Sequence, residues 1–452
     1  MNVREVNRVY FIGIGGIGMS ALARFFREQG AVVTGYDKTE TELTVQLAKE
    51  GMIIHYTDDV AHVDKDAQLV VYTPAIPKDH AELNWLVENH YPVYKRSDVL
   101  QWITQSMYAV TVAGTHGKTT ISTMTAYLLR ETNYGCNAFL GGISVNYDSN
   151  YWSSKNETAV IEADEYDRSF LKLHPDIAVL TAIDPDHLDI YGTVEEMEAA
   201  FIQYTKNIKL GGTLLVKHGL HRQDDLKGPV TMTYSLQNDQ ADVYAQNIVQ
   251  KDGGYLFDVV GEGWKLERMH LPIGGMHNVE NAVAAVAVTD ILGIDGAAVK
   301  QALSGFRGVK RRFEYVVKTG RVIYIDDYAH HPEELAALIK SAKHLFAGRR
   351  CVVAFQPHLF TRTRDLADGF AHSLDMADET ILLDIYPARE LPIAGVTSQM
   401  IADKMVNPAH TILSKEGLME YVKVAPIDLF ITAGAGDIDK LVEPIKHILE
   451  RR

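Results

Sequence analysis

Short apolar runs alternate along the chain with longer segments in which apolar residues recur at helical spacing. The run RVYFIGI at residues 8–14 predicts a buried strand, and the segment MSALARFFREQG predicts a helix that ends near Gly30. Further short strands are predicted at AVVTGYD, LVVYTPAIP and YPVYK. Strands that alternate with helices are typical of a parallel sheet covered by helices on both faces. This pattern extends to about residue 105.

The same alternation starts again after residue 105 and once more after residue 312. The second part contains the strand-like runs MYAVTVAGT, TAVIEAD, DIAVLTAI and GTLLVKHG, and the helix-like run NVENAVAAVAVTDILG. Between them, residues 230–272 alternate at period two, which predicts antiparallel strands. The third part contains RVIYIDD, CVVAFQPH, ETILLDIYPA and DLFITAGAGD. We therefore expect an α/β protein with three domains, at residues 1–105, 106–312 and 313–452.

Composition is that of a globular protein without a membrane span. Hydrophobic residues make up 46% of the 452 residues, and no run approaches the roughly 18 uncharged apolar residues that a span requires. The first apolar run enters a glycine loop without a small-residue cleavage site, so no signal peptide is expected. A net charge of -15 argues against nucleic-acid binding. Two cysteines, Cys136 and Cys351, predict buried thiols in a reducing cytoplasm.

The glycine loop GIGGIG at residues 13–18 follows a predicted strand and opens a predicted helix. It matches the pattern G-x-G-x-x-G, in which backbone amides and a helix N-terminus hold a diphosphate. Asp37 ends the next strand, where an acidic side chain could meet a ribose, and Ser20 could add a hydroxyl or only cap the helix. By itself the loop fits a nicotinamide-dependent dehydrogenase, any other diphosphate-linked nucleotide, or a simple tight turn.

A second glycine loop, GTHGKTT, lies at residues 114–120. It departs from a full Walker A motif because Val112 stands where the first glycine belongs. The amides of residues 114–118 can still surround an anion, Lys118 can reach the β- and γ-phosphates of a nucleoside triphosphate, and Thr119 can bind Mg²⁺. The alternative is a glycine turn that carries a surface lysine.

Acidic side chains follow two strands of the same predicted domain. EADEYD, residues 162–167, and DPDHLD, residues 184–189, each come after an apolar run. Mg²⁺ takes one or two carboxylates in addition to phosphate oxygens, so only some of these acids are needed. From the residues alone, His187 is either a structural histidine or a neighbour of the metal.

Four blocks together make the chain resemble the Mur ligase family of ATP-dependent peptidoglycan-precursor ligases: GTHGKTT, EADEYD with DHLD, HNVENAVAA and DDYAHHP. GIGGIGMS, FQPHLFTRT and DIYPARELPIAGVTS are similar to the branch that joins L-alanine to the lactyl carboxylate of UDP-N-acetylmuramate. The resemblance implies a Rossmann-like N-terminal domain for the UDP-sugar, a central P-loop ATPase-type domain with a mostly parallel sheet, and a Rossmann-like C-terminal domain that binds the amino acid and closes the site. It also implies that the first glycine loop holds the UDP-sugar diphosphate and not NAD.

The resemblance implies a role for each matching residue. The UDP-sugar would be bound by Gly15, Gly16, Ile17, Gly18, Ser20, Asp37 and Thr73. ATP would be bound by Gly114, Thr115, His116, Gly117, Lys118, Thr119, Thr120, Asn278, Asn281, Arg312 and Asp327. Two Mg²⁺ sites, which Mn²⁺ could also fill, would use Thr119, Glu162 and His187. The alanine would be bound by His358, Arg362 and Arg364, and the catalytic set would be Lys118, Glu162, His187, Arg312 and His330. For Asn278 the alternative is helix capping. For Arg362 and Arg364 the alternative is surface ion pairing.

One position departs from several relatives in the family. They carry a carbamylated lysine fourteen residues after the DHLD histidine, where this chain has Phe201. Phenylalanine cannot form a carbamate, and the L-alanine-adding branch lacks this lysine too.

Three other functions stay open: a recycling ligase that attaches a preformed peptide, a nucleotide-binding regulator, and a dehydrogenase. A monomer or a homodimer is expected, without nucleic acid or membrane insertion.

Overall fold

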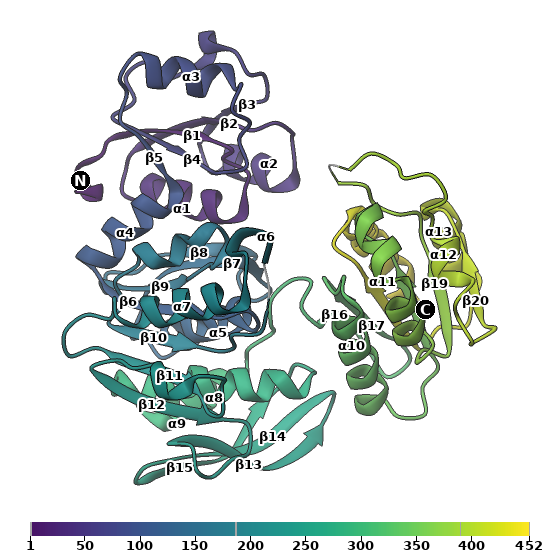
Figure 1. Cartoon of the computed structure of the whole chain (residues 1–452). Helices are drawn as coiled ribbons and strands as arrows, with labels where there is room; N and C mark the ends of the chain where they lie inside the picture. Colours follow the sequence, from purple (N-terminus) through teal and green to yellow (C-terminus); the bar gives the residue numbers. More distant parts are fainter. Residues whose placement is uncertain (1, 186–187, 389, 452) are drawn as a thin grey trace. The chain divides into compact units, whose positions relative to one another are not determined.

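The computed structural model describes residues 2–185, 188–388 and 390–451. It contains sheets of five, ten and six strands (Figure 1) and divides into two compact units. The first unit comprises the chain up to Asn247 together with Phe257–Met269 and Glu280–Ser304; the second comprises Ile248–Leu256, His270–Val279 and the chain from Gly305 onward. In the part of the chain that is described, no helix is long and apolar enough to cross a membrane.

The first sheet is entirely parallel, as predicted. Its strand order is β3-β2-β1-β4-β5, with β1 Arg8–Ile12, β2 Val32–Tyr36, β3 Ile53–His55, β4 Leu69–Tyr72 and β5 Val93–Lys95. The helices are α1 Ile17–Glu28, α2 Glu42–Lys49, α3 Ala81–Glu88 and α4 Arg96–Ser106, with short 3-10 turns η1 Val3–Glu5 and η2 Val60–His62. The carboxyl ends of β1, β4 and β5 therefore open toward one edge, which is where parallel sheets bind ligands.

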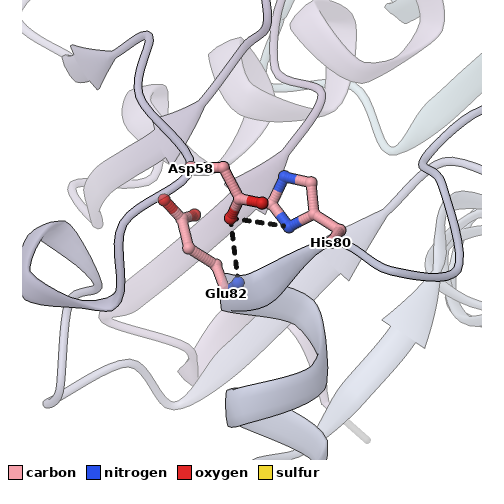
Figure 2. A group of neighbouring side chains, drawn as sticks. All are labelled: Asp58, His80 and Glu82. Carbon is pink, nitrogen blue, oxygen red and sulfur yellow. Dashed lines mark hydrogen bonds and ion pairs between the residues drawn. The ribbon is translucent and has the colours of Figure 1, made fainter.

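A buried polar network fixes α3 to this sheet. Asp58 caps the helix by accepting from the amides of Ala81 (2.8 Å) and Glu82 (3.0 Å), as Figure 2 shows in part. The fully buried Glu82 carboxylate accepts from the Tyr10 hydroxyl (2.6 Å) and pairs with His55 Nε2 (2.8 Å). Asp58, His80 and Glu82 are close enough to suggest a metal site. Because protein donors already satisfy their carboxylate oxygens, the group is explained as a structural network.

The second sheet is mostly parallel, which confirms that part of the prediction. Its order is β15-β14-β13-β12-β11-β10-β6-β9-β7-β8. The strands are β6 Tyr108–Ala113, β7 Asn137–Ser144, β8 Ser149–Trp152, β9 Thr158–Glu162, β10 Ile177–Leu180, β11 Thr213–Lys217, β12 Val230–Ser235, β13 Val243–Lys251, β14 Gly254–Gly261 and β15 Trp264–Leu271. The helices are α5 Lys118–Glu131, α6 Leu188–Tyr191, α7 Val194–Thr205, α8 Met276–Ile291 and α9 Gly296–Leu303, with 3-10 segments η3 Tyr166–Lys172 and η4 Gln223–Asp225.

The prediction of an antiparallel patch over residues 230–272 was wrong for its first strand. β12 pairs in parallel with both β11 and β13. The remaining strands, β13 to β15, are sheet neighbours joined by two-residue connections, which can only link antiparallel strands. Period-two alternation reports a half-exposed strand and does not by itself report the direction of its partner, which explains the error.

Helix α1 packs on the second sheet as well as on the first. Phe25 of α1 lies with its ring centroid 5.3 Å from that of Phe139 on β7. Asn150 of β8 is fully buried and donates to the Ile17 carbonyl (2.5 Å) and the Ser20 hydroxyl (2.9 Å). The first turn of α1, and with it the glycine loop that precedes it, is thus held by a strand of the second sheet.

The third sheet has the order β16-β17-β21-β18-β19-β20, with the last strand inserted in the middle. Its strands are β16 Glu314–Lys318, β17 Ile323–Asp327, β18 Cys351–Phe355, β19 Glu379–Leu382, β20 His410–Ile412 and β21 Leu429–Ala433, all parallel except the pair β16–β17. The helices are α10 Pro332–Leu345, α11 Phe360–Leu374, α12 Gln399–Ala402, α13 Lys415–Val424 and α14 Val442–Leu449, with η5 Asp437–Leu441. Helices α10 to α12 contribute to one buried cluster, and α13 and α14 contribute to another.

A buried carboxylate on β17 anchors the chain that enters this sheet. Asp326 is fully buried, lies 3.1 Å from Nε of Arg311 and accepts from the Thr432 hydroxyl at 2.6 Å. Arg311 also donates to the Gly434 carbonyl (2.5 Å). Burial raises the pKa of Asp326 to about 7, against the opposing charge of Arg311.

We expect Asp326 to make the second unit less stable as pH rises toward 8. A carboxyl with a raised pKa in the folded state contributes stability that is fully present below its unfolded pKa and is lost as pH rises through about 7. The slope should be on the order of 1 kcal/mol per pH unit. Urea unfolding followed from about pH 5 to about pH 8 should show this loss in the wild type and a flatter profile in Asp326→Asn. Parallel profiles for the two proteins would contradict the assignment.

Candidate functional site

The second glycine loop joins β6 to the N-terminus of α5, as predicted. Gly114 and Gly117 have positive φ angles of 123° and 81°. A Cβ at Gly114 would lie 2.2 Å from Thr181 Oγ1, and one at Gly117 would lie 2.9 Å from Asn281 Oδ1. Only glycine satisfies both the backbone conformation and the space at these positions, so the loop presents its backbone amides without side chains in the way.

Three of the polar side chains of this loop, Thr115, His116 and Thr120, differ in exposure. Thr115 is buried and its hydroxyl accepts from the Asp184 amide at 3.2 Å. The His116 side chain is 64% exposed, with Nε2 3.8 Å from Asp184, while the Thr181 hydroxyl donates to the His116 carbonyl. Thr120 is buried on the first turn of α5. The loop is thus fastened to the chain that follows β10.

Lys118 points back over the loop. Its ammonium donates to the Gly114 carbonyl at 2.8 Å and to the Glu165 carboxylate at 2.7 Å. Burial raises the pKa of Glu165, and the charge of Lys118 opposes this shift. The sequence placed Glu165 among the acids of EADEYD without separating it from its neighbours, so this partner of Lys118 is a finding of the structure.

Glu162 lies beside Thr119. The Thr119 hydroxyl donates to Glu162 Oε1 at 3.1 Å, and the Gly141 amide donates to Oε2 at 3.2 Å. A Cβ at Gly141 would lie 2.3 Å from the same carboxylate, so β7 leaves room for it only because this residue is glycine. A hydroxyl and a carboxylate side by side are the oxygen donors that Mg²⁺ prefers, and these two residues therefore fit the predicted metal.

Two further expectations concern the metal. His187 lies outside the described residues. Phe201, which stands at the position of the carbamylated lysine, is fully buried and packs edge-on against Phe170 with ring centroids 5.1 Å apart. This position belongs to the apolar core.

The two asparagines of α8 occupy different surroundings. Asn281 brings its Oδ1 next to Gly117 of the phosphate loop. Asn278 is buried, and its side-chain amide donates to the Gly274 carbonyl before the helix at 2.7 Å. This bond is local to the start of α8, but it differs from a helix cap, whose side chain accepts from a backbone amide. The adenine-binding role of Asn278 stays a prediction.

The first glycine loop lies at the carboxyl end of β1. The Gly15 amide donates to the Asp37 carboxylate at 2.7 Å. A Cβ at Gly13 would lie 2.8 Å from the methyl group of Thr73, which places Thr73 against the loop. Gly16 is the N-cap of α1 and Ile17 is its first residue. Ser20 is fully buried and donates to the Ile17 carbonyl at 2.9 Å, so its hydroxyl serves the helix start.

Arg96 is a residue of this site that the sequence did not reveal. It is the first residue of α4, directly after β5, and its guanidinium lies where a Cβ at Gly18 would meet Nη1 at 2.1 Å. The same guanidinium is 3.6 Å from Asp164, which follows β9. A positive charge thus lies against the first turn of α1. Only the position of an arginine after a parallel strand could have indicated it.

In the second unit, consecutive arginines diverge. Arg311 is held by Asp326, whereas Arg312 is exposed. Both guanidinium groups lie near the Tyr328 ring, at 5.3 Å and 5.5 Å from its centroid. Asp327 accepts from the Phe313 amide (2.7 Å) and the Ala329 amide (2.7 Å). Asp327, predicted to bind ATP, thus anchors the chain that connects to β16.

The histidines and arginines expected around the amino acid partly gather. The His330 and His358 rings are 6.3 Å apart. Burial lowers the pKa of His330, and the charge of Arg362 contributes to this shift. Arg364 instead forms an exposed ion pair with the adjacent Asp365 at 2.7 Å, the surface role that the sequence also allowed. Arg362 and His358 therefore fit one site better than Arg364 does.

Comparisons with known proteins match three consecutive parts of the chain to models of one family. Family models match in order along the chain: "Mur ligase family, catalytic domain" over residues 8–108, "Mur ligase middle domain" over 112–289 and "Mur ligase, glutamate ligase domain" over 311–436. A UDP-N-acetylmuramate–L-alanine ligase of Porphyromonas gingivalis is 48% identical over 98% of this chain and 99% of its own. The ligase of the same name from Cytophaga hutchinsonii is 46% identical over 100% of this chain and 99% of its own length.

Solved structures agree with these matches. The crystal structure of a UDP-N-acetylmuramate-alanine ligase from Thermotoga maritima has a TM-score of 0.85 at 29% identity and covers 98% of this chain and 99% of that one. A murein peptide ligase from Psychrobacter arcticus, with a TM-score of 0.69 and 22% identity over 98% and 99%, shares the fold. The three-domain α/β architecture is thereby confirmed, while the boundaries after residues 105 and 312 stay predictions.

We expect Gly141→Ala to weaken divalent-cation binding without unfolding the protein. Its methyl group would displace the Glu162 carboxylate, whereas its backbone conformation does not require glycine. Disturbing a group that orients a metal ligand, as the Gly141 amide would orient Glu162, costs roughly 10- to 100-fold in metal affinity. Mn²⁺ binding in the presence of ATP, followed by electron paramagnetic resonance, should show this loss. Gly320→Ala, which meets no atom within 4 Å, is the matched control; equal affinities in both variants would refute the role of Gly141.

Proposed function

The chain belongs to the Mur ligase family, and we propose that it joins L-alanine to the lactyl carboxylate of UDP-N-acetylmuramate through an acyl phosphate, with ATP as the energy source. It is an ATP-dependent ligase of peptidoglycan-precursor synthesis. The observation that carries this function is identity of 46–48% to L-alanine ligases over essentially the whole chain. We place the enzyme in the cytoplasm, where ATP is available.

In the proposed mechanism, the ATP phosphates lie in the loop of residues 114–118. The lactyl carboxylate attacks the γ-phosphorus of ATP. ADP departs as the leaving group, and the product is an acyl phosphate. Both reactants are anions, so Lys118 and Arg312 neutralise the approach and the charge on the transferred group. Mg²⁺, held by Thr119 and Glu162, would supply further positive charge to the phosphates. A second cation site at His187, and replacement by Mn²⁺, belong to the same proposal. Asn281 would face the nucleotide from α8.

The UDP-sugar diphosphate lies on the amides of Gly15 to Gly18, beside Thr73. Asp37, which now accepts from the Gly15 amide, turns to the ribose when the diphosphate takes that amide. Arg96 adds the positive charge that two phosphate groups require. Ser20 acts on this site only by holding the first turn of α1.

In the second half-reaction the amine of L-alanine attacks the acyl phosphate and inorganic phosphate leaves. Arg362 and His358 hold the alanine carboxylate, since a guanidinium binds a carboxylate through two parallel hydrogen bonds. The lowered pKa of His330 keeps its imidazole neutral near pH 7, the form that can accept a proton from the alanine ammonium. Domain closure would exclude water that otherwise hydrolyses the acyl phosphate.

Phosphate release measured with ATP, Mg²⁺ and UDP-N-acetylmuramate tests the function directly. We expect release to depend chiefly on L-alanine, and Lys118→Ala to lower the rate by about 100-fold or more. A parallel reaction with L-Ala-γ-D-Glu-meso-diaminopimelate distinguishes this function from that of a recycling ligase. Phosphate release chiefly with this tripeptide would make the protein a recycling ligase. Normal ligation by Lys118→Ala would refute the assignment of the ATP loop.

We expect Arg96→Ala to raise the KM for UDP-N-acetylmuramate by roughly 10- to 100-fold, because a charge-assisted hydrogen bond to phosphate is lost. The KM for ATP should change little. Lys95→Ala removes the adjacent exposed cation and serves as the control. Steady-state kinetics with each substrate varied in turn measure both values. An unchanged KM for the UDP-sugar in Arg96→Ala would remove Arg96 from the diphosphate site.

A further inference from the structure

Glu165 is a buried acid that the mechanism above does not use. It follows β9 in the run EADEYD, three residues after Glu162, and its side chain is 1% exposed. Its surroundings differ from those of the other acids in this run. Glu162 lies beside Thr119 and Gly141, and Asp164 accepts from the Tyr166 amide near Arg96. Glu165 alone among these acids contacts the ammonium of the phosphate loop.

The contact between Glu165 and Lys118 is close on both oxygens. Nζ of Lys118 lies 2.7 Å from Oε1 and 2.7 Å from Oε2, and the Lys118 side chain is only 14% exposed. Nζ also donates to the Gly114 carbonyl at 2.8 Å. An ammonium has three N–H donors. With one directed to the Gly114 carbonyl and one to the carboxylate, the direction of the third is set by the geometry of the loop.

The backbone of Glu165 is held as firmly as its side chain. Its carbonyl accepts from the Tyr191 hydroxyl at 2.7 Å and from the Arg168 amide at 3.0 Å. Tyr191 is buried. The carboxylate is therefore almost fully buried and belongs to a residue whose backbone carbonyl is held by two hydrogen bonds. Such a partner can restrain the lysine without itself reaching the substrate.

We propose that Glu165 is a positioning residue that holds the Lys118 ammonium so that its third N–H faces the β- and γ-phosphates of ATP. This proposal rests on the assignment of residues 114–120 to ATP. The long lysine side chain has many rotamers, and restraining them before the reaction makes its charge available where the transferred phosphoryl group develops negative charge. A carboxylate behind the lysine also repels the phosphates. Glu165 therefore favours correct orientation at the expense of ground-state affinity for ATP.

Replacing Glu165 with glutamine tests whether Glu165 orients Lys118 at the expense of affinity for ATP. The amide oxygen of Glu165→Gln can still accept one hydrogen bond, but the ionic restraint and the repulsion are both lost. We expect kcat to fall by about 10- to 100-fold, as for a small misplacement of a catalytic group. The KM for ATP should stay within about 3-fold of the wild-type value, or fall, since the repulsion is removed. The KM for UDP-N-acetylmuramate should not change. Glu195→Gln, an exposed glutamate on α7, is the matched control.

A double-mutant cycle decides whether Glu165 acts through Lys118. If it does, Glu165→Gln should have no further effect on kcat in a Lys118→Ala background. Wild-type kcat in Glu165→Gln, or effects of the two substitutions that multiply, would overturn the proposal. Thermal unfolding and UDP-N-acetylmuramate binding by calorimetry confirm that each variant is folded. If Glu165→Gln is unstable, Glu165→Asp, which keeps the charge but shortens the reach, should show the same fall in kcat with unchanged sugar binding.

The cycle also separates this proposal from the assignment on which it depends. Full activity in Lys118→Ala would refute the ATP loop itself. Low activity in Lys118→Ala with full activity in Glu165→Gln would leave the ATP loop intact and reject the positioning role alone.

Discussion

The proposed function depends on backbone amides in two loops, which must reach phosphate groups without side chains in the way. Two loops meet this requirement by placing glycine between a parallel strand and a helix N-terminus. At Gly114 and Gly117 both the φ angle and the neighbouring atoms exclude any other residue, and at Gly18 the neighbour is the guanidinium of Arg96. Because the helix N-termini carry only partial charge, each loop also needs a cation beside it. In the proposed function Arg96 is this cation at the first loop and Lys118 is this cation at the second.

The proposed reaction further requires that both loops keep a constant separation, since a carboxylate of one substrate must meet a phosphate of the other. Helix α1 provides this through its contacts with β7 and β8. Asn150 contributes to this contact, because its buried side-chain amide donates to the Ile17 carbonyl and to the Ser20 hydroxyl and so restrains the first turn of the helix. Apolar contacts such as Phe25 on Phe139 supply affinity between the layers but tolerate sliding more readily.

Features that depend on neighbouring residues could be read from the sequence, and features that depend on distant pairs could not. The glycine loops, the parallel strands and the acids at their ends follow from local periodicity and from motifs. The partnerships Gly18–Arg96, Gly141–Glu162 and Lys118–Glu165 join residues that no motif connects. The direction of β12 was misread for the same reason, since a strand's own alternation reports its exposure and not its neighbour. Resemblance to a family supplied roles, but it did not separate Glu162 from Glu165.

The adjacent arginines at the start of the second unit show how the fold assigns different tasks to similar side chains. Arg311 and Phe313 both adopt positive φ angles, 61° and 48°, which are unfavourable for side chains of this size. Two carboxylates of β17 offset this strain: Asp326 holds the Arg311 guanidinium, and Asp327 accepts from the Phe313 amide. Arg311 is thus held against Asp326 while Arg312 is exposed, although both guanidinium groups lie near the Tyr328 ring. Because Asp326 holds Arg311 and leaves Arg312 exposed, exchanging the surroundings of the two arginines would not be neutral, and the exposed one suits the proposed role at the γ-phosphate.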